Sequence, residues 1–165
     1  MANIQFNISA GKTVEYAARV NANDPANSAL IVVALQASGL EADSVLVDYD
    51  NLSVLLAASN NEATNVGYAR LVYDNTGGIT VTVDDTNNWV DVDFPDPSWA
   101  AVATAGGAWG ALLFCYDSDT TGGTDANIIP LTKHDFARTP NGGTITAVVP
   151  SGGWFREPSN PTGTF

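Results

Sequence analysis

The sequence has little of the chemistry on which most enzymes and metal proteins depend. It contains one cysteine and one histidine, Cys115 and His134, in 165 residues. A single cysteine can form no intrachain disulfide and no cysteine cluster for zinc or iron–sulfur. Cys115 also stands within an apolar run, where burial raises the pKa of a thiol and makes it inert. We therefore expect structural roles for both residues, no cofactor and no enzyme activity.

Basic residues are scarce as well. Lys and Arg number 6 against 18 Asp and Glu, which gives a formal net charge of -12. Nucleic acids are bound by Lys and Arg that displace counterions from phosphates, and an anionic membrane repels an acidic surface, so neither is expected as a partner. The longest apolar run, residues 29–35, is far shorter than the ~20 residues that cross a bilayer. The first residues lack the basic and apolar regions of a secretory signal, so we expect synthesis in a reducing cytosol.

Residues 1–65 predict two or three short helices. Asp24 followed by Pro25 is typical of a helix start, because aspartate caps free amides and proline has no N–H to satisfy there. We expect this helix to run to Gly39, a residue type that often ends helices. A second helix is expected over residues 51–58, capped by Asp50. Weaker signals indicate a further helix and a first strand: Val14, Ala17 and Ala18 for the helix, and Ile4, Phe6 and Ile8 for the strand.

Residues 66–156 have the period of two that is typical of strands. The runs 79–83 and 90–94 alternate apolar and polar residues and are joined by a polar connector, which predicts a hairpin with one dry and one acidic face. Further strands are expected over residues 111–116, 128–131 and 144–149, and an extended arm over 157–165. The expected fold class is α+β, mainly β, in a single domain of residues 1–165. Its C-terminal part would be an antiparallel β-sandwich or barrel.

Acidic segments are the strongest candidates for chemistry. The segment 117–122 resembles the start of a calcium loop, but position five is Thr121 and position twelve is Ile128, so it is not an EF-hand. A weak oxygen-ligand site using Asp117, Asp119 and Asp125 is one interpretation, and a solvated turn is the other.

Two further patterns suggest carbohydrate chemistry. Asp91 and Asp93 share one strand face, as paired carboxylates of a glycosidase would, but any Asp-x-Asp strand has this spacing. Tryptophans could form a sugar-stacking platform, yet they are scattered along the chain, which favours core edges or subunit contacts. They are Trp89, Trp99, Trp109 and Trp154.

The order of motifs in the second half is similar to that in small virion proteins of tailed bacteriophages. The segments that carry the resemblance lie within residues 79–156: an aspartate–proline corner leading to tryptophan at 92–99, a strand at 109–117 ending in tyrosine–aspartate, a strand at 128–136 ending in aspartate–phenylalanine, and a Gly-Gly-Thr hairpin at 142–146. The Gly ending that commonly follows aspartate–phenylalanine is absent, because Ala137 and Arg138 stand there.

The resemblance implies a capsid decoration (cement) protein on the outer surface of the virion, made in the host bacterial cytoplasm. Its partners would be the major capsid protein and other copies of itself, with a trimer expected from symmetry. Expected contact residues are at the terminal arms: Ile4, Phe6, Trp154, Phe155 and Phe165. The alternatives are a tail or head-fibre component that recognises host-surface glycans, and a small acidic hydrolase built on Asp91, Asp93 or Asp117.

Overall fold

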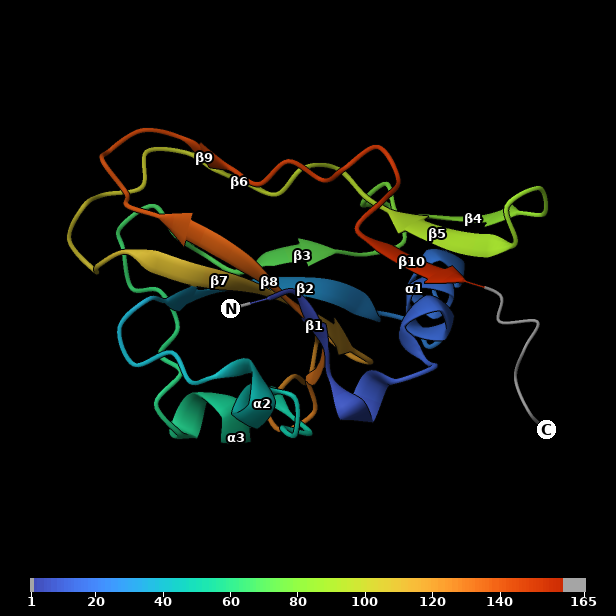
Figure 1. Ribbon diagram of the computed structural model, residues 1–165, viewed down its shortest axis with the longest axis horizontal. Coiled ribbons are helices and arrows are strands. Elements are labelled where there is room, and N and C mark those ends of the chain that lie inside the picture. Colours follow the sequence, from blue (N-terminus) through green and yellow to red (C-terminus); the bar gives the residue numbers. More distant parts are fainter. Residues whose placement is uncertain (1, 159–165) are drawn as a thin grey trace.

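The computed structural model describes residues 2–158, which form mainly antiparallel β-structure with short helices (Figure 1). This confirms the expected fold class. No helix in this part of the chain has the length and apolar character to cross a membrane. The elements in chain order are β1 (Ile4–Gln5), η1 (Asn7–Ser9), α1 (Thr13–Ala22), β2 (Ala29–Gln36), α2 (Asp43–Leu46), α3 (Leu52–Ala57), β3 (Leu71–Tyr73), β4 (Thr80–Asp84), β5 (Trp89–Asp93), β6 (Ser98–Trp99), β7 (Trp109–Asp117), β8 (Ile129–Arg138), β9 (Ile145–Thr146) and β10 (Phe155–Pro158).

The strands form layers rather than a closed barrel. The main sheet has the order β1-β8-β7-β2-β3, and its two edge strands do not pair with each other. A three-stranded sheet, β10-β5-β4, and a two-stranded sheet, β6-β9, complete the β-structure of the described residues. In Figure 1, β6 and β9 lie above the main sheet, and α2 and α3 lie below it. The barrel alternative is therefore wrong, and a layered, sandwich-like arrangement remains.

The main sheet is buried on both faces, and β2 shows this most clearly. Its side chains alternate between two apolar clusters, with Leu30 and Val32 in the upper one and Ile31 and Val33 in the lower one. The upper cluster includes residues of α1, β5, β6 and β9, and the lower cluster includes residues of α2 and α3. A strand covered on both sides is apolar at successive positions instead of at every second one.

The predicted helix over residues 24–39 is wrong, because this stretch contains β2. A short continuous apolar run fits a doubly buried strand as well as a buried helix, and spacing alone does not separate them. The Asp24–Pro25 peptide bond is cis and lies in the connection between α1 and β2. Gly39, expected at a helix end, lies in a turn with φ of +83°, where a Cβ would stand 2.6 Å from the carbonyl oxygen of Ser59.

Other predicted elements are confirmed with changed bounds. The helix near residues 51–58 is α3, but its cap is Asn51, whose Oδ1 accepts from the Val54 amide at 3.0 Å, and not Asp50. The weaker helical signal corresponds to α1, and the hairpin is β4–β5. The dry face of that hairpin is incomplete, because Val83 is 65% exposed.

Three further predicted segments have other bounds in the structure. The alternation from Ile4 to Ile8 gives a strand only over Ile4–Gln5, after which η1 begins. The strand expected over 144–149 is limited to Ile145–Thr146. The start of the expected arm is wrong, because Phe155–Pro158 pairs with β5 as β10.

Candidate binding site

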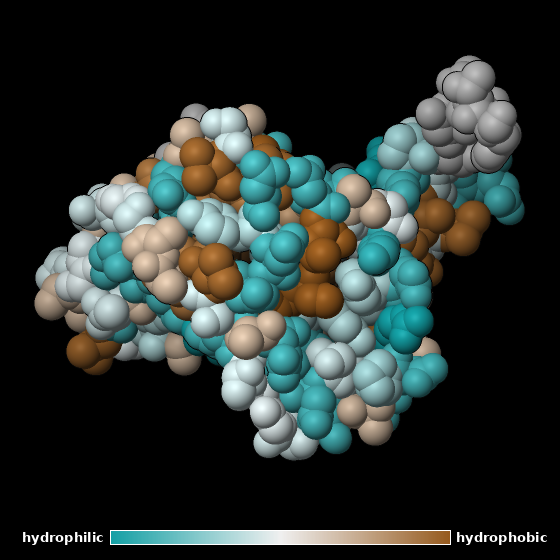
Figure 2. All heavy atoms as spheres, turned by 90° about the horizontal axis from the view of Figure 1, so that it is seen from below, coloured by the Kyte–Doolittle hydropathy of each residue, from teal (hydrophilic) through white to brown (hydrophobic). Residues whose placement is uncertain are grey.

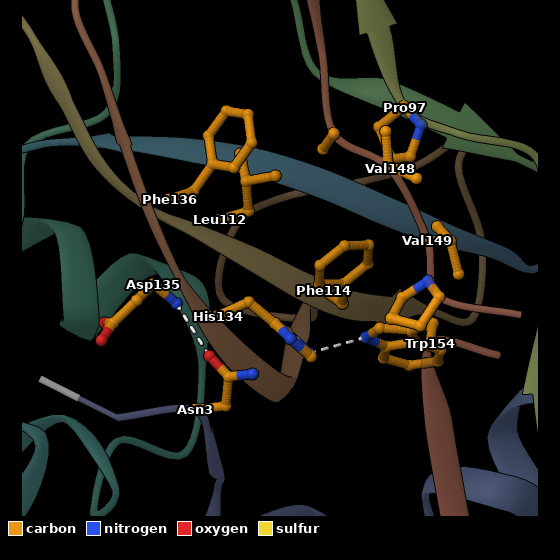
Figure 3. Close-up of a pocket in the computed structure, with 12 residues that line it drawn as sticks. Asn3, Pro97, Leu112, Phe114, His134, Asp135, Phe136, Val148, Val149 and Trp154 are labelled. Carbon is orange, nitrogen blue, oxygen red and sulfur yellow. Dashed lines mark hydrogen bonds between the residues drawn. The ribbon is translucent and has the colours of Figure 1, made fainter. Parts of the chain in front are cut away.

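A pocket of about 280 Å³ lies between β8 and the segment that follows β9 (Figure 3). Most of its wall is apolar, with rings from three aromatic residues and branched side chains from the 147–150 segment. Its lining residues are Asn3, Pro97, Leu112, Phe114, His134, Asp135, Phe136, Ala147, Val148, Val149, Pro150 and Trp154.

Strand register places the side chains at the base of this pocket. On β7 and β8, Leu112 is opposite His134 and Phe114 is opposite Thr132, so all four side chains stand on the upper face of the main sheet. The rings of Phe114 and His134 are edge to face, with centroids 5.1 Å apart. The indole of Trp154 packs on Phe114 with centroids 5.0 Å apart. Alternation along two paired strands therefore creates the floor, and Trp154 closes one side.

A three-membered hydrogen-bond cluster fixes the imidazole of His134. The indole Nε1–H of Trp154 donates to His134 Nε2 at 3.0 Å and to Thr132 Oγ1 at 2.9 Å. Thr132 Oγ1 lies 3.0 Å from the same imidazole nitrogen. An indole N–H is a donor only, so its bond to His134 makes Nε2 an acceptor and assigns the proton of the neutral imidazole to Nδ1.

The other imidazole nitrogen, Nδ1, is available to a ligand. Among the described residues, Nδ1 has no hydrogen-bond partner. It is also not completely buried, because it is absent from the fully buried side-chain atoms that lack a partner. Nδ1 is therefore partly accessible, on a residue that lines the pocket. Burial, reinforced by the charge of Lys133, lowers the pKa of His134 to about 4, so the ring is neutral at pH 7.

The residues that precede β1 hold the far wall of the pocket. The backbone amide of Asp135 donates to Asn3 Oδ1 at 3.0 Å. The amine of Lys133, whose side chain is 0% exposed, donates to the carboxylate of Asp135, to Asp43 Oδ1 at 2.8 Å and to the carbonyl oxygen of Ala2 at 2.8 Å. These bonds fasten the start of the chain and α2 to β8, which keeps Asn3 beside the pocket.

The candidate calcium ligands do not converge on a cation site. Asp125 forms two hydrogen bonds with Arg70, of 2.5 and 3.0 Å, and this partner lowers the pKa of its carboxyl. Asp119 Oδ1 accepts from the amide and hydroxyl of Thr121, and Asp117 Oδ1 accepts from the amide of Asp119. Within residues 2–158, no three acidic, histidine or cysteine side chains are grouped as metal ligands. Asp117 and Asp119 instead accept hydrogen bonds from nearby amides of the turn, and Asp125 pairs with Arg70. Asp117 is 4% exposed, so the solvated turn of the other interpretation describes it only in part.

The candidate catalytic residues are also separated or engaged. Cys115 is fully buried in the lower cluster, where burial raises the pKa of its thiol, whereas His134 is on the upper face. Asp91 is paired with Arg156, at 2.6 Å from Oδ1 to Nε. Asp93 Oδ1 accepts from the amide of Phe94 at 2.9 Å.

Three of the four tryptophans lie inside the upper cluster, deeper than the core edges or subunit contacts that the sequence favoured. Trp99 and Trp109 are packed edge to face with centroids 5.1 Å apart, and Trp154 is 6% exposed. Trp89 is half-buried, and the guanidinium of Arg156 lies 3.8 Å from its ring centroid. The four rings therefore do not form an exposed platform for sugars.

The predicted contact residues are divided between the two clusters. Ile4 is half-buried and Phe6 fully buried against the lower cluster. Trp154 and half-buried Phe155 belong with the upper cluster. Phe6 and Trp154 thus pack inside the protein in this conformation and expose almost no surface to a partner. Phe165 lies outside the described residues.

The sequence does not indicate the pocket. His134 and Trp154 are 20 residues apart with no motif that joins them, and no pattern distinguishes Phe136, Val148 and Val149 from other apolar residues. Their only signal was apolar character near the strand and the hairpin. Comparison with protein-family models, with curated proteins and with solved structures gives no match. The resemblance to phage virion proteins therefore stays a prediction, and function must be argued from the molecule itself.

Proposed function

We propose that the protein is a non-enzymatic structural component of a bacteriophage particle, a decoration protein that binds the outer capsid surface and stabilises contacts between capsomers. The virion assignment depends on the order of motifs in residues 79–156. The observation that carries the binding role is that the outer strands β4 and β3 have exposed apolar side chains, while the reactive groups are buried or paired. Exposed strand edges suit attachment to a partner better than bond cleavage.

Unpaired strand edges supply surfaces for attachment. β4 is an outer strand of the three-stranded sheet, and β3 is an outer strand of the main sheet. Val83 on β4 is 65% exposed and Val72 on β3 is 57% exposed. An edge strand with a free row of backbone groups can accept a strand from a partner, and an exposed apolar side chain adds specificity. A capsid subunit could use either edge in this way.

The face that carries the helices is a poorer candidate. Figure 2 shows apolar side chains on the lower face as small patches separated by polar residues. Val45 of α2 and Val54 of α3 are 45% and 53% exposed. A specific interface buries more than about 1,000 Å² in total, with an apolar centre. We therefore assign attachment to the sheet edges, and we place the helical face and its acidic surroundings toward solvent.

The test is reconstitution on particles that lack this protein. Purified protein is added to such particles, and binding is measured by co-sedimentation while heat-induced genome release is followed by dye fluorescence. We expect saturable binding and a higher release temperature. Absence of co-sedimentation would contradict the proposal.

A matched pair of variants tests where the protein attaches. Val83→Glu and Val45→Glu introduce the same charge at exposed valines of β4 and of α2. We expect the β4 variant to weaken binding and the α2 variant to bind like the wild type. Equal loss in both variants would overturn the assignment to the β4 edge.

A further inference from the structure

We propose that the pocket beside His134 is a binding site for a small uncharged molecule that has one aromatic ring or branched apolar group and one hydrogen-bond acceptor, such as a ketone, ester or amide. The inference depends on the shape of the pocket and on its donors. It does not depend on the capsid proposal and goes beyond it.

The size and lining of the pocket set the apolar part of the ligand. A volume of about 280 Å³ lies near the lower limit of ligand pockets, about 300 Å³. A single ring is accommodated in an apolar cavity of about 150 Å³, so one ring with a short substituent suits this space. Phe114 and Trp154 provide aromatic surfaces, and Val149 and Pro97 provide aliphatic ones (Figure 3). Stacked or edge-to-face contacts with such rings favour an aromatic ligand.

Two hydrogen-bond donors, on His134 and Asn3, determine the polar group that the ligand should carry. The Nδ1–H of His134 is oriented by the bond that Trp154 makes to the opposite nitrogen. The Oδ1 atom of Asn3 accepts a hydrogen bond from the backbone amide of Asp135. The Nδ2 group of Asn3 therefore points away from that amide, and it has no hydrogen-bond partner among residues 2–158. Both side chains line the pocket. A carbonyl oxygen has two lone pairs and can accept from such donors.

Charge argues for an uncharged ligand. The chain carries a formal net charge of -12, and the carboxylate of Asp135, a lining residue, is paired with Lys133. The nearest amine, that of Lys133, is fully buried and already donates to three oxygen atoms. No Lys or Arg lines the pocket, and the guanidinium of Arg138, 5.2 Å from the ring centroid of Phe136, is outside the lining. An anion would therefore meet the negative charge of the chain without a cation in the lining to offset it. A cation would find hydrogen-bond donors where it needs acceptors.

The donor and the rings are held in place before any ligand arrives. Thr132 and His134 are part of β8, which pairs with β7 over most of its length. Trp154 is fixed by its two hydrogen bonds and by its contacts with Phe94 and Phe114. A rigid site loses little conformational freedom on binding, which favours affinity for a small ligand.

Three small molecules of nearly the same shape test the proposal on the wild-type protein. Acetophenone has a ring and a carbonyl oxygen, ethylbenzene replaces that oxygen with hydrogens, and benzoate replaces the methyl group with a charged oxygen. Binding is followed by NMR, using the indole N–H signals of the four tryptophans and the signals of the single histidine. We expect acetophenone near 1 mM to shift the signals of Trp154 and His134. A net hydrogen bond gives about fivefold tighter binding than ethylbenzene, and benzoate gives no shift.

Other results overturn the inference. No shift with acetophenone refutes the site, equal affinity for ethylbenzene refutes the acceptor, and tighter binding of benzoate refutes the uncharged class. Val149→Phe, which fills the pocket, should abolish the shifts, whereas Val83→Phe on β4 should preserve them. Unchanged signals of Trp99 and Trp109 verify that each variant is folded. Should Val149→Phe not fold, the comparison of the three ligands decides alone.

Discussion

Lowering the pH from about 7 to about 4.5 should destabilise the protein through its single histidine. Burial, together with the positive charge of Lys133, lowers the pKa of His134 from 6.5 to about 4. Between these two values the unfolded chain binds a proton on this residue and the folded protein does not. The free energy of unfolding therefore falls as the pH falls through this interval, and it is fully retained above pH 6.5.

The magnitude follows from the size of that interval. Each pH unit is worth about 1.4 kcal/mol, so the loss reaches about 3 kcal/mol near pH 4 as an upper value. Several aspartates have pKa values below their ordinary 3.8, and their contribution is lost only as the pH falls below that value. They are Asp43, Asp74, Asp84, Asp119 and Asp125. Most of the change between pH 7 and pH 4.5 therefore belongs to His134.

Urea unfolding at a series of pH values measures this loss, and NMR of the one histidine measures its pKa directly. The control is His134→Gln, whose side-chain oxygen can still accept from Trp154 but does not titrate. We expect the variant to keep a constant stability between about pH 7 and pH 4.5, while the wild type loses stability. A wild-type protein with constant stability over this range, or a histidine that titrates near its ordinary 6.5, would refute the reasoning.

Three further results are expected from other buried or paired groups. Lys133→Met removes the buried amine that holds Asp43 and Asp135, and urea unfolding should show a loss of about 3 kcal/mol; no loss would mean that the cluster is not structural. Because burial raises the pKa of the Cys115 thiol, a thiol reagent at mildly alkaline pH should react only after unfolding, and rapid labelling of the folded protein would contradict the structure. Millimolar calcium should leave the melting temperature unchanged, because Asp125 is paired with Arg70; a clear increase would restore the cation site.

The sequence predicts correctly those elements that form from residues close together in the chain. The β4–β5 hairpin follows from alternation over two runs with a polar connector. α3 follows from apolar residues spaced three and four apart after a capping residue, although Asn51 and not Asp50 supplies the cap. β2 could not be recognised, because its burial on both faces depends on helices and strands distant in the sequence.

The pocket could not be predicted for a similar reason. Its lining comes from segments near residues 3, 97, 112–114, 134–136 and 147–154, which are far apart in the chain. The short pairing of β6 with β9, Trp99 opposite Ile145, accompanies the placement of the 147–150 segment beside β8. Strands of two residues show no periodicity, so the sequence contains no signal for this pairing. His134 could be identified as a residue without a catalytic partner, but not as an oriented donor.

The abundance of this protein in purified particles tests the proposed capsid role most directly. Quantitative mass spectrometry can compare the number of copies of this chain with that of the major capsid protein. A decoration protein should give a ratio of about one, as for one trimer at each junction of three capsid subunits, or about one third, as for a single chain at each junction. A count of about a dozen copies or fewer per particle, as expected for a component at one unique vertex, would contradict the claim.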